Sequence, residues 1–163
     1  MFERRLAMLH DPQCFEENRM EPVSDHRWYE TEQEAILQEE MRLRCSLNGI
    51  WKFLWAPNPA SVPDGFEKPE FSCQGWQEIP VPAQMELNGY GRPQYTDTSY
   101  PWDGREQVKP HEVPVEENPT GCYVRYFSLP ENFTGKRIQL HFEGVETAFH
   151  CWLNGKYIGY SED

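Results

Sequence analysis

Residues 147–160, "TAFHCWLNGKYIGY", contain the dipeptide that most restricts the backbone of this chain. Asn154 and Gly155 suit the two central positions of a type I′ turn, which both need a positive φ angle. Such a turn joins two antiparallel strands, because its twist matches the twist of the strands that flank it. The stretch therefore predicts a β-hairpin, and a chain that contains antiparallel sheet.

A half-buried strand is predicted from "GIWKFLW", which begins at Gly49. Trp51, Phe53 and Trp55 alternate onto one face of an extended chain, while Lys52 lies on the other. Three rings on one face provide enough apolar surface to build a core.

Two further segments carry strand signals ahead of the hairpin. They are "CYVRYFSL" at residues 122–129 and "RIQLHFEG" at residues 137–144. In the second segment Ile138, Leu140 and Phe142 alternate with polar residues, which is the period of a strand with one buried face. We expect both segments to join the sheet.

The first 45 residues are polar and show no sustained hydrophobic period. Within them Thr31, followed three residues later by Glu34, forms a capping-box signature that opens "TEQEAILQEEMRLR". The apolar positions after it are sparse, so the packing face of this helix is narrow. Residues 1–45 are predicted to form an extended arm with one short helix.

Residues 46–163 combine the strand signals with two long irregular regions. This pattern is typical of a mainly β, antiparallel fold with long loops, and it favours a β-sandwich or jelly roll over a small closed barrel. The chain has 163 residues, 38% of them hydrophobic, which is enough for one domain with a core.

The charge balance excludes two classes of partner. There are 27 acidic and 15 basic residues, a net charge of -12, and no basic stripe that could neutralise phosphates. Nucleic acids and anionic membranes are therefore poor partners. No apolar run resembles a membrane helix or a signal peptide, so we expect a cytoplasmic protein.

Neither the cysteines nor the histidines form a recognisable metal or disulfide pattern. The five cysteines contain no CxxC pair, and an odd number in a chain without a secretion signal favours reduced thiols. The five histidines show no HxH or HxxxH spacing. From these residue types alone we expect no bound metal.

The segment "PQYTDTSYPWDG", residues 93–104, gathers rings, carboxylates and hydroxyl groups among turn-forming residues. Rings beside short hydrogen-bonding groups suit a polar, flat-faced small molecule such as a sugar. The alternatives stay open at this point. Asp97 is also a common type of turn cap, and Tyr95, Tyr100 and Trp102 could anchor the loop or enter the core.

Several blocks, taken in order, resemble one family. They are "SLNGIWKF", "VPDGF", "IPVPAQMELNGYGRPQYTDTSYPWDG", "VPVEENPTGCYVRYF" and "FEGVETAFHCWLNGKYIGYSED", which are similar to the N-terminal sugar-binding domain of β-galactosidases of glycoside hydrolase family 2. The likeness extends from about Arg5 to the last residue. It implies a jelly roll, here cut short at its C-terminal end, that precedes two immunoglobulin-like domains and a catalytic TIM barrel.

The resemblance places the catalytic glutamates in the barrel, and no motif in this chain matches the segments that carry them. A TIM barrel typically takes about 250 residues, so this chain cannot contain one. The adjacent acids Glu116 and Glu117 are interpreted as a solvated turn, because glycosidases need two carboxyls about 5 to 10 Å apart across the bond. We expect no catalytic residue in these 163 residues.

The resemblance also assigns the candidate site residues. It implies that Asp97 contacts galactose, and that Asp163 contacts both galactose and a structural sodium ion. A carboxylate can accept from two sugar hydroxyls at once, through charge-assisted bonds. Tyr95, Tyr100 and Trp102 are the candidate rings for the face of the sugar.

For the whole enzyme the resemblance implies retaining hydrolysis of terminal β-galactosides such as lactose, with magnesium and sodium bound, in a homo-oligomer. This chain alone would bind no cofactor and would need the rest of the enzyme as its partner. Two alternatives remain: a stand-alone carbohydrate-binding module, and a structural fragment that docks to a partner chain. A module that stopped after "KYIGY" would expose a strand edge, which favours a longer protein.

Overall fold

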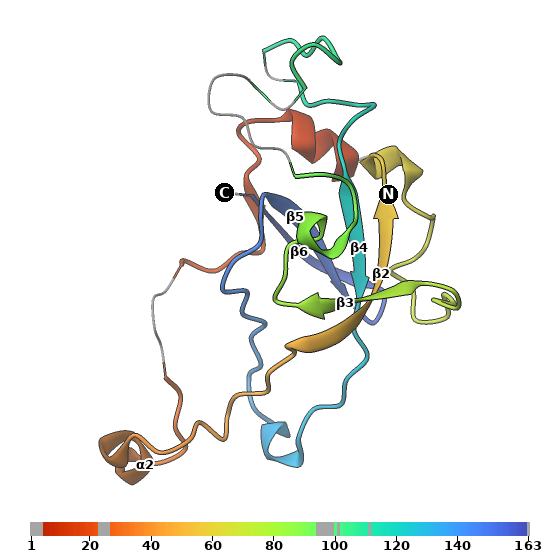
Figure 1. The fold of residues 1–163 in the computed structure, drawn as a ribbon. Helices are drawn as coiled ribbons and strands as arrows, with labels where there is room; N and C mark the ends of the chain where they lie inside the picture. Colours follow the sequence, from red (N-terminus) through yellow and green to blue (C-terminus); the bar gives the residue numbers. More distant parts are fainter. Residues whose placement is uncertain (1–4, 23–26, 94–99, 101, 111, 163) are drawn as a thin grey trace.

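The computed structural model describes residues 5–22, 27–93, 100, 102–110 and 112–162 (Figure 1). Its strands form two antiparallel sheets of three strands each, in the orders β3-β2-β4 and β1-β6-β5. Among the described residues, the helical elements with both ends given are one short α-helix and four 3-10 turns. The prediction of a mainly β, antiparallel domain is confirmed.

The first sheet has β2 (Gly49–Ala56) at its centre, between β3 (Gln77–Val81) and β4 (Thr120–Val124). The alternating rings predicted this strand, and the register pairs Phe53 with Gln77 on one side and with Tyr123 on the other. Phe53 is fully buried, and its ring centroid lies 4.8 Å from that of Tyr123 and 4.5 Å from that of Tyr90.

The second sheet is built on the predicted hairpin, β5 (Ala148–Leu153) and β6 (Lys156–Glu162). Asn154 and Gly155 adopt φ angles of 50° and 76°, as a type I′ turn requires. The short strand β1 (Glu16–Glu17) adds to β6 from the N-terminal arm. The arm thus contributes a strand to the sheet.

The core is small and mostly lies against the first sheet. The buried hydrophobic residues are Phe53, Ala56, Val62, Ile79, Cys122 and Tyr160. Phe66, from the loop between η2 (Pro59–Ser61) and β3, connects the two sheets through its ring, which lies 6.1 Å from Trp76 and 6.0 Å from Trp152.

The capping box is present, but the helix is shorter than its pattern suggested. Thr31 Oγ1 accepts the amide of Glu34 at 3.2 Å, and a carboxylate oxygen of Glu34 accepts the amide of Thr31 at 3.2 Å. The helix α2 (Glu32–Leu37) then ends at Gln38, whose φ is 51°. It has no buried residue, so no tertiary contact extends it toward residue 44.

The prediction of a strand at residues 137–144 is wrong. The segment has no strand assignment, and it runs as an irregular trace from η4 (Glu131–Phe133) toward β5 (Figure 1). Ile138, Leu140 and Phe142 are 49%, 44% and 39% exposed. Apolar and polar residues do alternate here, but no described segment pairs with this backbone through the hydrogen bonds of a β-sheet. Likewise β4 ends at Val124, well before residue 129.

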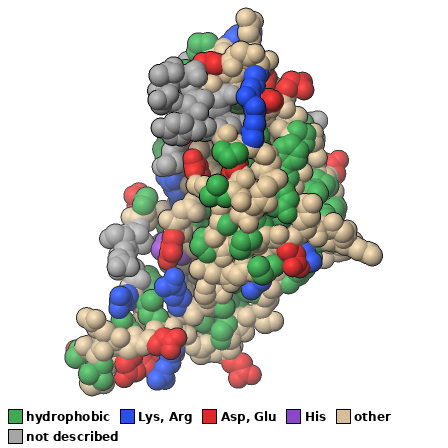
Figure 2. All heavy atoms as spheres, viewed as in Figure 1, with side chains coloured by type: hydrophobic (Ala, Val, Ile, Leu, Met, Phe, Trp, Pro, Cys, Tyr) green, Lys and Arg blue, Asp and Glu red, His purple; other side chains and the backbone are tan. Residues whose placement is uncertain are grey.

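Apolar side chains are exposed at many points of the surface. Figure 2 shows hydrophobic side chains across the viewed face and at the end of the molecule that carries α2, where Ile36 is 68% exposed. No helix in the described part of the chain is long and apolar enough to span a bilayer.

All five cysteines are free in the structure. Cys122, on β4, is buried, and this burial raises the pKa of its thiol to about 12. The side chain therefore behaves as a small core residue and stays protonated at neutral pH.

Candidate functional site

Two of the five candidate sugar contacts lie in the described part of the chain. Tyr100 and Trp102 stack, with ring centroids 5.2 Å apart and ring planes 10° from parallel. The outer ring, Tyr100, is 67% exposed. Both rings are candidate sugar contacts from the sequence, and the structure shows them as a stacked pair in which Tyr100 is exposed. Tyr95, Asp97 and Asp163 lie outside the described residues.

The stacked pair is held by a tight turn. The amide of Asp103 donates to the carbonyl of Tyr100 at 3.0 Å, and Asp103 Oδ2 accepts the amide of Tyr100 at 3.0 Å. An aspartate that accepts a backbone amide in this way stabilises a turn. The amide of Arg105 then donates to the carbonyl of Trp102 at 3.0 Å. Asp103 therefore caps the turn that presents the rings.

Glu117 is the centre of an ion-pair network beside this turn. Its Oε2 accepts from Arg105 Nη1 at 3.0 Å and from Arg92 Nη2 at 3.3 Å. All three side chains are partly exposed, between 38% and 48%. In the sequence, the two arginines flank four of the five candidate sugar contacts, all but Asp163.

Glu106 makes a second network, with backbone donors. Its carboxylate accepts the amides of Val115, Glu116 and Glu117 at 2.7, 3.1 and 3.3 Å. The amide of Val115 contributes most to lowering the pKa of Glu106, because an N–H donor favours the charged carboxylate. Glu106 is therefore an ionised acceptor at neutral pH, and it holds no proton to donate.

The turn that carries Glu117 is fastened to the end of β2. The amide of Asn118 donates to the carbonyl of Pro57 at 3.1 Å, and Asn58 Nδ2 donates to the carbonyl of Glu116 at 3.3 Å. Two residues further along, Thr120 opens β4 opposite Ala56. The position of Glu117 is thus fixed relative to the core sheet.

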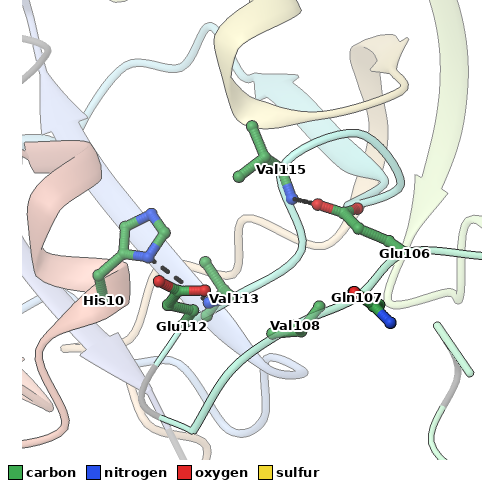
Figure 3. A pocket seen from close by; sticks show the side chains of 7 residues that line it. All are labelled: His10, Glu106, Gln107, Val108, Glu112, Val113 and Val115. Atoms are coloured by element: carbon green, nitrogen blue, oxygen red, sulfur yellow. Dashed lines mark hydrogen bonds between the residues drawn. The ribbon is translucent and has the colours of Figure 1, made fainter.

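A cavity of about 270 Å³ lies between the arm and this loop (Figure 3). His10, at the end of η1 (Ala7–His10), lines one side, and its Nδ1 accepts the amide of Val113 at 3.5 Å. The rest of the lining comes from Glu106, Gln107, Val108, Glu112, Val113 and Val115.

The two carboxylates in the lining already have partners. Glu106 accepts the three amides described above, and Glu112 accepts the amide of Lys109 at 3.3 Å and lies 3.9 Å from its ammonium group. Both carboxylates therefore hold the loop that lines this cavity.

No metal centre forms among the described side chains. Within residues 5–22, 27–93, 100, 102–110 and 112–162, no three His, Cys, Asp or Glu side chains come together in a way that could hold an ion. Asp163, the candidate sodium ligand, is outside these ranges.

Sequence reasoning missed the role of Glu117, which it interpreted as part of a solvated turn. The side chain is half exposed, yet it pairs with Arg92 and Arg105. One signal was available: the two arginines flank the aromatic segment and carry the same charge, so a shared acidic partner would relieve their repulsion. The sequence did not show which of its acids would be that partner.

The chain is similar to known proteins over most of its length. Residues 44–163 match the family described as "Glycosyl hydrolases family 2, sugar binding domain". A beta-galactosidase of Halalkalibacterium halodurans is 47% identical over 97% of this chain, and one of Streptococcus thermophilus is 41% identical over all of it. The chain covers 16% of each of these proteins. A beta-galactosidase large subunit of Leuconostoc lactis is 38% identical over 99% of the chain, which covers 27% of that subunit.

Proposed function

This chain belongs to the glycosyl hydrolase family 2 sugar-binding domains, and from that membership we propose that it forms the sugar-binding part of a β-galactosidase. The observation that carries the proposal is the match of residues 44–163 to the sugar-binding family, together with near-complete coverage of the chain by proteins named beta-galactosidase. The whole enzyme would hydrolyse terminal β-galactosides such as lactose with retention.

The proposed role of this part is to form a wall of the active site and to contact galactose. Asp97 and Asp163 would accept hydrogen bonds from sugar hydroxyls, since an ionised carboxylate makes stronger hydrogen bonds than a neutral acceptor. Tyr95, Tyr100 and Trp102 would present their rings to the apolar face of the sugar. The exposed stacked pair of Tyr100 and Trp102 supports this role.

The chemistry would be supplied by the rest of the protein. In the cavity of Figure 3, Glu106 accepts backbone amides, and Glu112 accepts an amide and lies near the ammonium group of Lys109. Magnesium and sodium would act in the whole enzyme, with Asp163 as one sodium ligand. Magnesium would be held by residues outside this chain.

The proposed partner is the remainder of the enzyme, in a homo-oligomer. The exposed apolar side chains between Tyr126 and Val145 support this partner, because a surface of this kind is a usual place for a covering interface. We also propose a cytoplasmic location, a compartment in which thiols stay reduced. The division into an arm at 1–45 and a jelly roll at 46–163 belongs to the same proposal.

The proposal is tested by substituting Asp97→Ala in the full-length enzyme. We expect kcat/KM for a β-galactoside to fall about 100-fold, because the sugar hydroxyls lose a charged acceptor. Asp64→Ala, at an exposed turn before β3, is the matched control and should leave kcat/KM unchanged. Near-normal kinetics for the Asp97→Ala enzyme, with the fold intact, would overturn the sugar-contact role.

A further inference from the structure

We propose that residues 5–19 form a strap that detaches from the second sheet when His150 takes up a proton. This sheet is built on the hairpin of β5 and β6, and His150 lies on β5. The strap includes η1 and β1, and it contacts the hairpin both at β1 and at Arg5. Its release would be a property of the domain itself, independent of any sugar.

The strap is attached to the sheet through backbone contacts. Glu17 of β1 lies opposite Tyr160 of β6, and the amide of Glu162 donates to the carbonyl of Phe15 at 3.0 Å. The strand β1 has only two residues, and a strand this short depends on the contacts around it. Because β1 is at the edge of the sheet, the strap can leave without breaking the pairing of β5 with β6.

Gly159, on β6, allows the strap to lie close to the sheet. A Cβ at this position would lie 2.8 Å from the carbonyl oxygen of Glu17, closer than Cβ atoms approach other atoms in proteins. The oxygen belongs to the backbone of the strap, so no rotation of a side chain can relieve the clash. A methyl group at residue 159 should therefore push the strap away from β6.

The strap also covers a cluster of rings on the hairpin. The register places His150 opposite Tyr160 and Trp152 opposite Tyr157. The imidazole of His150 stacks on Tyr160 with centroids 4.6 Å apart, and its Nδ1 lies 3.3 Å from the hydroxyl oxygen of Tyr157. The guanidinium carbon of Arg5 lies 3.2 Å from the centroid of the Tyr157 ring. The cation of the strap thus lies on a ring that contacts His150.

The surroundings of His150 disfavour a positive charge. Burial contributes most to lowering the pKa of His150 to about 4, and the charge of Arg5 adds to this effect. Glu17 and the carbonyl of Arg5 act in the opposite direction and are outweighed. Tyr157 and Tyr160 stay neutral, because burial raises the pKa of each hydroxyl. A proton on His150 therefore places a second cation beside Arg5 in a poorly hydrated cluster.

Detachment of the strap relieves both causes. It would expose the imidazole to water and move the guanidinium of Arg5 away, so the pKa of His150 would return toward its ordinary value near 6.5. The detached form then binds the proton more tightly than the attached form, and proton uptake favours detachment. Attachment is therefore strongest above about pH 7 and weakens as the pH falls toward 4.

The test is amide hydrogen exchange in the full-length protein, measured by mass spectrometry on peptides from the strap. After correction for the intrinsic effect of pH on exchange, we expect the opening equilibrium of the strap to increase about tenfold from pH 7 to pH 5. Peptides from β2 should stay protected over the same exchange time. Equal protection of the strap at both pH values would overturn the proposal, as would loss of protection in the strap and β2 together.

Two substitutions separate the proton from the fit. His150→Gln removes the titrating ring, so the strap should open to the same extent at pH 7 and pH 5. Gly159→Ala should open the strap about tenfold already at pH 7, because the added methyl group meets the carbonyl of Glu17. Gly144→Ala is the matched control, since a Cβ there has nothing within 4 Å, and it should behave as wild type.

A pH response that persists in the His150→Gln protein would overturn the role of the histidine, and a protected strap in Gly159→Ala would overturn the docking geometry. If His150→Gln fails to fold, Arg5→Gln replaces it. Without the guanidinium, the strap should be more open at pH 7 and should gain less on acidification than in wild type. A wild-type response of Arg5→Gln at both pH values would contradict the proposal.

Discussion

The strand β2 (Gly49–Ala56) and the segment 137–143 have the same kind of sequence and different structures. In both, large apolar residues occupy every second position: Trp51, Phe53 and Trp55 in β2, and Ile138, Leu140 and Phe142 in the other segment. The strand β2 is paired on both sides, and Phe53 is fully buried within it. Residues 137–143 form no strand, and Ile138 remains 49% exposed. Alternation indicates which face a strand would bury, but a strand forms only where neighbours accept its hydrogen bonds.

The unpaired segment does make side-chain contacts. Glu143 accepts from Arg44 Nη2 at 3.0 Å, and the ring of Phe142 lies 4.7 Å from that of Phe149. These contacts hold the segment beside the arm and the start of β5. They do not replace the backbone hydrogen bonds of a sheet, and the side chains of Ile138, Leu140 and Phe142 stay partly exposed. Exposed apolar surface of this kind is often covered by an interface.

The largest expected difference between the two regions is in the cost of removing a ring. Phe53→Ala should lower the free energy of unfolding by about 3 to 5 kcal/mol, because it leaves a cavity between Tyr90 and Tyr123. Phe142→Ala, at 39% exposure, should cost less than half of that. Urea unfolding of the purified protein measures both. Equal costs would show that the segment 137–143 is packed as tightly as β2.

A smaller difference is expected from two glycines. A Cβ at Gly121, on β4, would lie 2.6 Å from the ring of Tyr123 and 2.9 Å from that of Phe53. Gly121→Ala should therefore cost about 1 to 3 kcal/mol through overpacking. Gly144, beside the unpaired segment, has nothing within 4 Å of its Cβ position, so Gly144→Ala is the matched control. Thermal unfolding of the two variants checks the contrast, which would fail if Gly144→Ala proved the more damaging.

The smallest effect concerns pH and the second sheet. Burial, aided by the positive charge of Arg5 and opposed by Glu17, lowers the pKa of His150 to about 4. The folded chain then binds its proton less readily than the unfolded chain, whose histidine has a pKa near 6.5. The neutral His150 side chain therefore makes its full contribution to the free energy of unfolding above about pH 7, and this contribution is lost as the pH falls toward 4.

Allowing for the partial exposure of the ring, this loss amounts to about 1 to 2 kcal/mol. His150→Gln should flatten the dependence of the free energy of unfolding on pH between pH 7 and 4. Urea midpoints at several pH values measure the slope. An unchanged slope in the His150→Gln protein would contradict the assignment.

The features that the sequence predicted correctly are local. Asn154 and Gly155 decide the hairpin by their own φ preferences, and Thr31 with Glu34 decides the start of α2. The alternation of β2 also gave the correct strand, because its neighbours β3 and β4 are present. The turn and the helix start depend on residues close together in the sequence. The strand β2 depends on β3 and β4, which lie on either side of it in the structure.

The features that it did not predict depend on distant partners. The capping box could not tell how far α2 extends, since no contact buries its face beyond Leu37. In the candidate site, the rings of Tyr100 and Trp102 were found by composition, but their stacking needed the turn capped by Asp103. The pairing of Glu117 with Arg92 depends on where two loops meet, which residue spacing does not encode.

The central claim is that these residues are the sugar-contacting part of a longer β-galactosidase. The most direct measurement is the length and activity of the native polypeptide, isolated from its source cells and mapped by peptides outward from these 163 residues. We expect the peptides to continue into a chain several times longer that hydrolyses lactose. A native polypeptide confined to this region, without galactoside hydrolysis by itself or with a partner, would contradict the claim.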